Sequence, residues 1–370
     1  MNKSIFNSVR FVAAGLISLA VLSSCKKDKM KDPVGDPLPK STLGVYVLAE
    51  GAFGRPNNST ITYYDIASKA VDKDYFKTKN GIDLGTDAND LKQYGSKMYC
   101  VVTGSAGIIN DAYVEVINIT TGKSIKRISF SDAIGDFHPR YIVFNKNKAY
   151  VSSYDGNISK IDTAALTIES RVKVGGALEG MAIVNNKLYV ANSSHPFIID
   201  PNNSSVSVLD LSTFTKKTEI PVSFNPTKLA AASNGDVYVI TSGQYLPEIK
   251  PAFERINTIS DTKTQTYDLG ISALAIGANK TLAITNYPNL LKAIDVNTGT
   301  LNAEFITDAT HITSLYALTF NPINNDIFVF DATDYSGDGK AFSFDSNGKK
   351  TLEFPTGTAP KAGVFHYSYK

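Results

Sequence analysis

The sequence contains few residues of the kinds that hold metals or form cross-links, with two cysteines and four histidines in 370 residues. The four histidines, at 138, 195, 311 and 366, show no H-x-x-x-H or other ligand spacing, which speaks against a metal centre. The phosphate loop, Gly-x-Gly-x-x-Gly and Gly-x-Ser-x-Gly are all missing. No sequence pattern therefore predicts a catalytic group or a cofactor.

An excess of charge of one sign is also missing. The formal net charge is +2, and without Lys3 and Arg10, which lie in a segment expected to be removed, basic and acidic residues are equal in number. A neutral chain has no general field that attracts nucleic acid, so we exclude that class of partner. No stretch shows a helical period over ten residues, whereas 43% of residues are hydrophobic, enough for a sizeable core.

Residues 1–24 are predicted to be an export signal. Lys3 and Arg10 form a basic region, and Phe11 to Leu22 form an apolar run that is too short to span a bilayer comfortably. The run ends in Leu22-Ser23-Ser24-Cys25, which resembles a bacterial lipobox. The resemblance implies lipidation of Cys25 and a protein held on the outer membrane, on its cell-surface or periplasmic side. An ordinary cleaved signal peptide is the alternative.

Residues 25–41 are predicted to be a lipidated, flexible tether, because this stretch carries charge, proline and glycine without apolar periodicity. Acylation of Cys25 would leave Cys100 as the one free thiol, in a strand-like segment. We therefore expect a buried, inert thiol at Cys100 and no disulfide within the chain.

A short pattern recurs seven times in residues 42–370. Successive copies start roughly 40 to 50 residues apart, the spacing of a four-stranded propeller blade. Each copy has a Tyr-Val-like strand, an alternating strand, a polar turn and a further strand. The first copy lacks the strand that precedes the Tyr-Val strand elsewhere, and the chain ends in a spare strand, Ala359 to Tyr369. We predict an all-β, seven-bladed β-propeller of four-stranded blades, closed by the C-terminal strand completing the first blade.

The polar turns of six copies begin with an Asp or Asn. Such a side chain can accept a hydrogen bond from the backbone N–H two residues on, which closes the turn. The residues are Asp65, Asn118, Asp162, Asp210, Asp295 and Asp345.

The best-preserved copy is Lys187 to Val222, "KLYVANSSHPFIIDPNNSSVSVLDLSTFTKKTEIPV". It is similar to the repeats of the YVTN and YncE-like seven-bladed propellers, whose Pro-x-x-(I/L/V)-A element survives at Pro226 to Ala230. The chain also looks similar to surface lipoprotein propellers found beside TonB-dependent transporters, among them cobalamin-capturing ones. That resemblance implies a cobalamin-like ligand or a transporter partner, although propellers host many unrelated functions.

In each blade, the loop that leads into the innermost strand and the loop between the second and third strands lie on one face. The fourth and fifth units have the longest of these loops, and we predict a ligand site on this face. Aromatic and polar side chains together suit a sugar, a corrin or another amphipathic ligand. The candidates are Phe53, Arg55, His138, Arg140, Tyr154, His195, Phe197, Gln244, Tyr245, Tyr287, Asp334 and Tyr335.

Two other functions stay open. One is an interaction scaffold without a small ligand, and the other is a propeller lactonase using Glu50, His138, Arg140 and Glu179. We expect no catalysis, no cofactor, no metal and a monomeric propeller. The loop Asp331 to Gly339 lacks the alternating acidic positions and closing Glu of a calcium loop, which favours a solvated turn.

Overall fold

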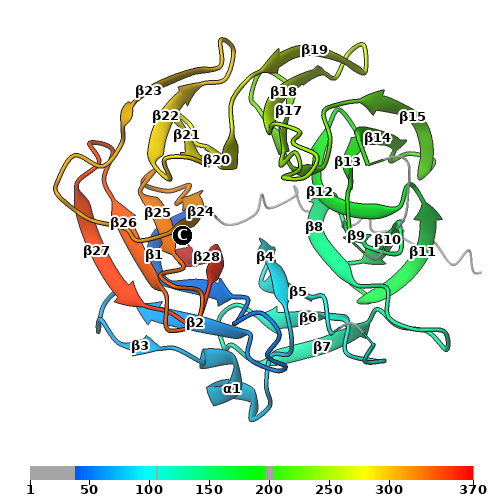
Figure 1. Cartoon of the computed structure of the whole chain (residues 1–370). Helices are drawn as coiled ribbons and strands as arrows, with labels where there is room; N and C mark the ends of the chain where they lie inside the picture. Colours follow the sequence, from blue (N-terminus) through cyan, green and yellow to red (C-terminus); the bar gives the residue numbers. More distant parts are fainter. Residues whose placement is uncertain (1–37, 106, 197, 199–202, 370) are drawn as a thin grey trace, which may run out of the picture. The chain divides into compact units, whose positions relative to one another are not determined.

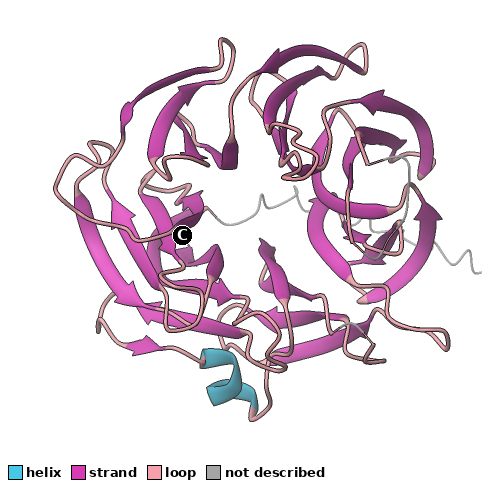
Figure 2. Cartoon of the chain, in the orientation of Figure 1, coloured by secondary structure: helices cyan, strands magenta, loops and turns pink. Residues whose placement is uncertain are grey.

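The computed structural model describes residues 38–105, 107–196, 198 and 203–369. The predicted export signal, Cys25, most of the predicted tether and Phe197 lie outside these residues. In the described part, strands form almost all of the regular structure (Figure 2). None of its helices is long and apolar enough to cross a membrane.

Seven four-stranded antiparallel sheets form the blades of a ring, which confirms the predicted β-propeller (Figure 1). From the innermost to the outermost strand, blade 1 consists of β28 (Pro360–Tyr369), β1 (Pro39–Ala49), β2 (Thr60–Asp65) and β3 (Val71–Asp72). Blade 2 consists of β4 (Ala88–Tyr94), β5 (Lys97–Val102), β6 (Tyr113–Asn118) and β7 (Ser124–Ser129). Blade 3 consists of β8 (Pro139–Asn145), β9 (Lys148–Ser153), β10 (Asn157–Asp162) and β11 (Thr167–Lys173).

The other four blades repeat this order. Blade 4 has β12 (Ala177–Val184), β13 (Lys187–Ser193), β14 (Ser205–Asp210) and β15 (Thr215–Pro221), and blade 5 has β16 (Pro226–Ala231), β17 (Val237–Thr241), β18 (Ala252–Asn257) and β19 (Thr262–Tyr267). Blade 6 has β20 (Ile271–Ile276), β21 (Thr281–Thr285), β22 (Leu291–Asp295) and β23 (Thr300–Glu304), and blade 7 has β24 (Leu315–Phe320), β25 (Ile327–Asp331), β26 (Lys340–Phe344) and β27 (Lys350–Pro355).

The C-terminal strand closes the ring. β28 pairs with β1 inside blade 1, and its neighbours among the innermost strands are β24 and β4 (Figure 1). The prediction that the last strand completes the first blade is therefore confirmed. β1 begins at Pro39, so residues 39–41 of the segment predicted as tether lie in this strand.

The core consists of seven hydrophobic clusters, one between each pair of neighbouring blades. A single four-stranded sheet cannot bury both of its faces, whereas blades arranged radially cover one another. The cluster between blades 7 and 1 contains Phe365 and Tyr367 of β28. Cys100 lies fully buried between blades 1 and 2, and this burial raises the pKa of its thiol. The expectation of a buried thiol is thus confirmed.

The Asx turns form as predicted at five of the six positions. In each of these the side-chain oxygen of the Asp or Asn accepts from the N–H two residues on, at 2.8–3.0 Å. Asp65 differs, because it accepts from the N–H of Ser68, three residues on, at 2.7 Å.

A short helix that the sequence pattern did not predict follows β3. Helix α1 (Tyr75–Asn80) is capped by Asp74, which accepts from the N–H of Lys77, and ends at Gly81, whose φ is 72°. Phe76 of this helix packs into the cluster between blades 1 and 2. At six residues, the helix is too short to produce a recognisable period.

Replacing Gly180 with Ala is expected to destabilise the contact between blades 4 and 5. A Cβ atom at Gly180 would lie 2.8 Å from both the Cα of Lys228 and the carbonyl oxygen of Thr227, which are backbone atoms of β16. Overpacking of this kind costs about 1–3 kcal/mol. Thermal unfolding of Gly180→Ala measures the loss, and Gly135→Ala is the control, since its Cβ would meet nothing within 4 Å. An unchanged Tm in Gly180→Ala would show that the two strands separate at no cost.

Candidate functional site

The pairing of every innermost strand is irregular near its first residues. In all seven blades the register between the innermost strand and the second strand shifts at this point. A bulge of this kind removes a residue from the ladder and re-aims its side chain. The residues left out of the pairing are Lys361, Asn89, Arg140 with Tyr141, Glu179 with Gly180, Thr227, Ser272 and Tyr316.

These bulges lie where the innermost strands begin, at the face that we call the front face. It carries the loops into the innermost strands and the loops between second and third strands; the opposite face is the back face. Neighbouring innermost strands contact one another around the ring. Because the shift recurs at the same depth in every blade, polar side chains from distant parts of the sequence meet at the centre of the front face.

The first group at this centre surrounds Glu50, which follows β1. Its carboxylate accepts hydrogen bonds from the Tyr316 hydroxyl and from the Lys361 ammonium. The side chains of Lys361 and Glu50 are each 18% exposed, so the pair is shielded from water. Burial, together with the charge of Glu50, raises the pKa of Tyr316, which keeps this hydroxyl a donor.

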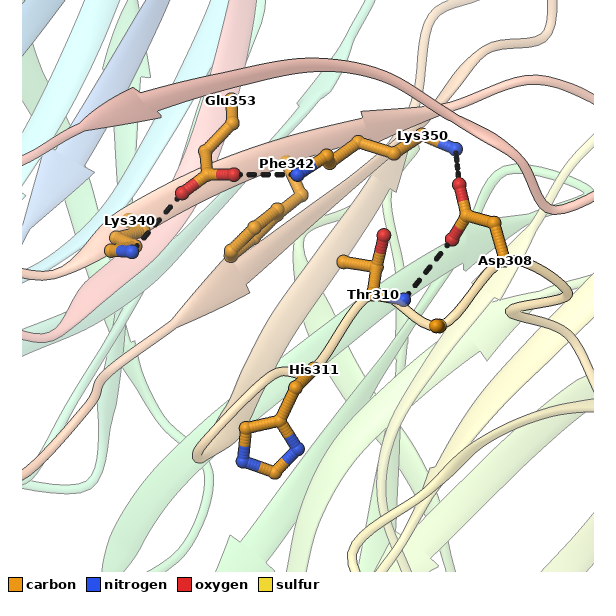
Figure 3. Close-up of a pocket in the computed structure, with 8 residues that line it drawn as sticks. Asp308, Thr310, His311, Lys340, Phe342, Lys350 and Glu353 are labelled. Carbon is orange, nitrogen blue, oxygen red and sulfur yellow. Dashed lines mark hydrogen bonds and ion pairs between the residues drawn. The ribbon is translucent and has the colours of Figure 1, made fainter.

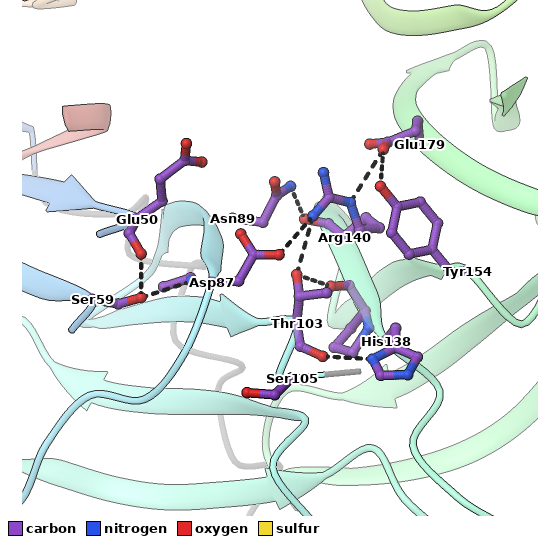
Figure 4. Close-up of polar contacts among 12 residues, drawn as sticks. Glu50, Ser59, Asp87, Asn89, Thr103, Ser105, His138, Arg140, Tyr154 and Glu179 are labelled. Atoms are coloured by element: carbon purple, nitrogen blue, oxygen red, sulfur yellow. Dashed lines mark hydrogen bonds and ion pairs between the residues drawn. The ribbon is translucent and has the colours of Figure 1, made fainter. Parts of the chain in front are cut away.

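The second group has the same chemistry and surrounds Glu179 of β12. One carboxylate oxygen accepts from Tyr154 at 2.6 Å and from Nε of Arg140 at 3.2 Å (Figure 4). The guanidinium also lies over the Tyr154 ring, 4.7 Å from its centroid. Burial and the charge of Glu179 raise the pKa of Tyr154, so this tyrosine is also a proton donor.

Asn89 of β4 joins the two groups. Its Oδ1 accepts from Lys361 at 2.7 Å, and its Nδ2 donates to the Arg140 carbonyl oxygen at 2.5 Å. The result is one continuous chain of contacts, which we call the polar arc. It consists of Tyr316, Glu50, Lys361, Asn89, Arg140, Glu179 and Tyr154.

Aromatic pairs flank the arc at both ends. The rings of Tyr154 and His195 lie 4.2 Å apart, and those of Tyr316 and Tyr335 lie 5.5 Å apart, edge to face. Burial and the nearby charge of Arg140 lower the pKa of His195, which favours a neutral ring at pH 7. The first pair belongs to blades 3 and 4, and the second pair belongs to blade 7. Two blades lie between the pairs in either direction around the ring, so the pairs oppose each other.

The structure brings some of the predicted site residues together at this centre. Arg140, Tyr154 and His195 contact one another or share partners, and Tyr335 reaches the arc through Tyr316. His138 lies next to them, with its Nδ1 3.1 Å from the carbonyl oxygen of Thr103 (Figure 4).

Other predicted residues lie on the rim of the front face, away from the polar arc. Phe53, Tyr245 and Tyr287 are 106%, 88% and 96% exposed, and Arg55 is exposed in the same loop as Phe53. Gln244 donates to the carbonyl oxygens of Leu246 and Pro247 in its own loop. Phe197 lies outside the described residues.

The sequence interpretation missed several residues of the centre, namely Lys361, Tyr316, Asn89 and Lys228. A signal for one of them is present, because Lys361 follows a proline at the start of an innermost strand, as Arg140 and Thr227 also do. Tyr316 and Asn89 have no preceding proline, so the same signal would not have found them.

The loop Asp331 to Gly339 uses its carboxylates within the fold. Asp331 accepts from the N–H groups of Ser314 and Thr333, and Asp334 accepts from those of Ser336 and Gly337. In the part of the chain that the structure describes, no three His, Cys, Asp or Glu side chains are grouped to hold a metal ion.

A separate hollow of about 590 Å³ lies outside the centre, against β26 and β27 (Figure 3). Glu353 pairs with Lys340 at 3.0 Å and with Lys350 at 2.7 Å, and Asp308 accepts from the Lys350 N–H at 2.6 Å. The His311 ring points away from Asp308 and Thr310 (Figure 3). Because its carboxylates and lysines satisfy one another, this hollow is a weaker candidate than the polar arc.

Comparisons with known proteins support the fold. A quinonprotein alcohol dehydrogenase-like protein from Bacteroides thetaiotaomicron VPI-5482 matches with a TM-score of 0.63 and 17% identity, covering 88% of this chain and 78% of that chain. Hydrazine synthase from Kuenenia stuttgartiensis matches with a TM-score of 0.55 and 13% identity, covering 72% of this chain and 85% of that chain. At such identities the likeness shows the fold alone.

No curated protein sequence matches the chain. A sequence family does match, over residues 43–362, which covers blades 2 to 7 and all of blade 1 except the start of β1 and most of β28. The chain therefore belongs to the propeller family described as "Domain of unknown function (DUF5074)".

Proposed function

We propose that this chain is a lipid-anchored outer-membrane protein that captures a small amphipathic ligand, cobalamin-like or a glycan, at the centre of its front face. The polar arc between two opposed aromatic pairs is the observation that carries the proposal. Rings supply contact area, and a few fixed polar groups set orientation. Bulges hold five members of the arc on strands rather than on loops, which keeps this part of the site rigid; they are Lys361, Asn89, Arg140, Glu179 and Tyr316.

The anchor at Cys25 is proposed from the lipobox-like Leu22-Ser23-Ser24-Cys25. β1 runs antiparallel to β28, which starts at the front face, so β1 begins at the back face. Pro39, the first residue of β1, therefore lies at the back face.

The rim of the front face supports docking on a partner such as an outer-membrane transporter. Its loops expose large apolar side chains from several blades, and such side chains mark interaction surfaces when they gather. They include Phe53, Ile134, Tyr245, Leu246 and Tyr287, each at least 77% exposed. This rim could surround a ligand held at the centre while a partner contacts the loops.

We propose binding without catalysis. The two carboxylates at the centre, Glu50 and Glu179, each accept from a tyrosine and a cation, which leaves them committed to structural contacts. With a panel of lactones, the unchanged chain should show no turnover above the uncatalysed rate. Turnover by the unchanged chain that is lost in Glu179→Gln would support the lactonase alternative instead.

A thermal-shift screen of the purified chain against corrinoids, haem and oligosaccharides tests ligand capture. A ligand at about one hundred times its dissociation constant should add about 2.7 kcal/mol of stability. We expect His195→Ala to reduce this shift, because it removes the ring that packs against Tyr154. His311→Ala is the matched control, as it lies in the separate hollow. A shift that is reduced in His311→Ala but unchanged in His195→Ala would assign the ligand to that hollow. If no ligand changes the Tm, an interaction scaffold is favoured.

A further inference from the structure

Lys228 of β16 differs from the other cations at the centre of the front face. Arg140 pairs with Glu179 and Lys361 pairs with Glu50, whereas Lys228 makes no ion pair within the described residues. Its ammonium donates to the carbonyl oxygen of Ser272 at 2.9 Å, which leaves two of its three N–H groups without an acceptor among the described residues.

The surroundings of Lys228 disfavour its charge. Burial, followed by the positive charge of Lys361, lowers the pKa of Lys228 to about 8. Glu179 and Glu50 act in the opposite direction, and Lys92 of β4 adds to the repulsion. Lys228 directly follows the bulge at Thr227, and its ammonium contacts Ser272, the bulge residue of β20, so it lies among the residues at the start of the innermost strands. A charge in such a place costs free energy unless an opposite charge approaches it.

The carboxylates in and beside the arc already have cationic partners, so they do not supply that opposite charge. Glu50 and Glu179 are held by their tyrosines and cations, and Asp87 lies 3.6 Å from Arg140. The site therefore has paired carboxylates and one unpaired ammonium. A ligand that enters it meets an unsatisfied donor rather than an unsatisfied acceptor.

We propose that the centre of the front face selects small molecules that combine a ring with an anionic group, and that Lys228 binds this anionic group. The inference rests on the proposed function, because it names the class of ligand for the same site. The ring of the ligand packs against the aromatic pairs, Tyr154 with His195 or Tyr316 with Tyr335. Charge-assisted hydrogen bonds from Lys228 then orient it.

Three probes of one shape and different charge test the selection: benzoate, benzyl alcohol and benzylammonium, titrated into the purified full chain at constant ionic strength. Calorimetry is expected to give the tightest binding for benzoate and the weakest for benzylammonium. The reverse order would overturn the inference, because it would show that Glu50, Glu179 and Asp87 set the charge preference.

Variants of Lys228 locate the effect. Lys228→Met should weaken benzoate binding about tenfold or more, since it removes a charged hydrogen-bond donor. Lys228→Arg should retain most of the affinity, and Lys126→Met, on an exposed position of β7, should change nothing. Equal benzoate affinity in Lys228→Met and the unchanged chain would overturn the proposal.

The thermal stability of the ligand-free protein gives a readout that does not depend on the affinity for benzoate. Without ligand, Lys228→Met should unfold at a higher temperature than the unchanged chain at pH 7, because the unpaired charge is gone. Benzoate should raise the Tm of the unchanged chain but not that of the variant. A lower Tm for Lys228→Met, with benzoate shifts equal in both proteins, would mean that Lys228 serves the fold alone.

The pH dependence follows from the same group. Benzoate binds the protonated ammonium, so its affinity should be constant below about pH 8, as long as benzoate itself stays ionised, and fall about tenfold for each pH unit above pH 8. Lys228→Arg should abolish this fall. An oligosaccharide or corrinoid could raise the Tm in a way that depends on His195 while benzoate does not bind. In that case the proposed function stands and this inference fails. If neither those ligands nor benzoate bind, both fail.

Discussion

A chain that ends at Thr358 is expected to lose the cooperative unfolding transition of the full chain. The deletion removes β28, the innermost strand of blade 1, and exposes the edge of β1. It also removes Val364, Phe365 and Tyr367, which are buried in the clusters on both sides of the blade. Each such side chain contributes about 1.5–3 kcal/mol, so their sum is comparable with the total stability of a domain.

Circular dichroism and thermal unfolding measure this effect. The control ends at Ser368, because Tyr369 is 43% exposed at the end of the strand. A peptide of residues 359–370 added to the shortened chain should restore part of the transition by occupying the empty edge. If the chain ending at Thr358 unfolds with the Tm and amplitude of the full chain, closure by β28 is not needed for stability.

Arg140→Met is expected to lower the free energy of unfolding by about 3–5 kcal/mol, because it leaves Glu179 buried without its cation. The two side chains are 12% and 11% exposed, so water compensates little. Arg140 also donates to Thr103 at 3.2 Å and covers the Tyr154 ring, and the substitution removes both contacts.

Urea unfolding of a double-mutant cycle separates these contributions. Arg140→Met combined with Glu179→Gln should recover part of the loss, since the remaining side chain is neutral. Lys126→Met is the control for removing an exposed cation, with an expected change within about 0.5 kcal/mol. If Arg140→Met is as stable as that control, the arc adds nothing to the fold.

The fold was predictable because its determinants are local. Alternating strands, Asx turns and the Tyr-Val pattern recur within each copy, and each specifies a blade without reference to its neighbours. Closure followed from counting strands, because the first copy lacks one and the chain ends in another. Helix α1 escaped prediction because six residues carry too little periodicity.

The candidate site was predictable only in part. Arg140, Tyr154 and His195 were predicted because they lie in or next to loops of one face that are long or contain aromatic residues, and binding residues are frequent in such loops. The same reasoning selected Phe53, Tyr245 and Tyr287, which the fold leaves on the exposed rim. Sequence shows that a residue lies on a front-face loop, but not whether its side chain turns toward the centre.

The sequence by itself determined that this chain forms seven mutually covering sheets, because the periodicity and turn residues act within each unit. Only the tertiary structure decided which polar residues meet at the centre. Glu50 and Lys361 lie 311 positions apart, and Tyr316 and Glu50 lie 266 apart, yet each pair shares a hydrogen bond. Ring closure and the bulge at the start of every innermost strand create these contacts, and the repeat pattern does not show which side chains the bulges turn toward the centre.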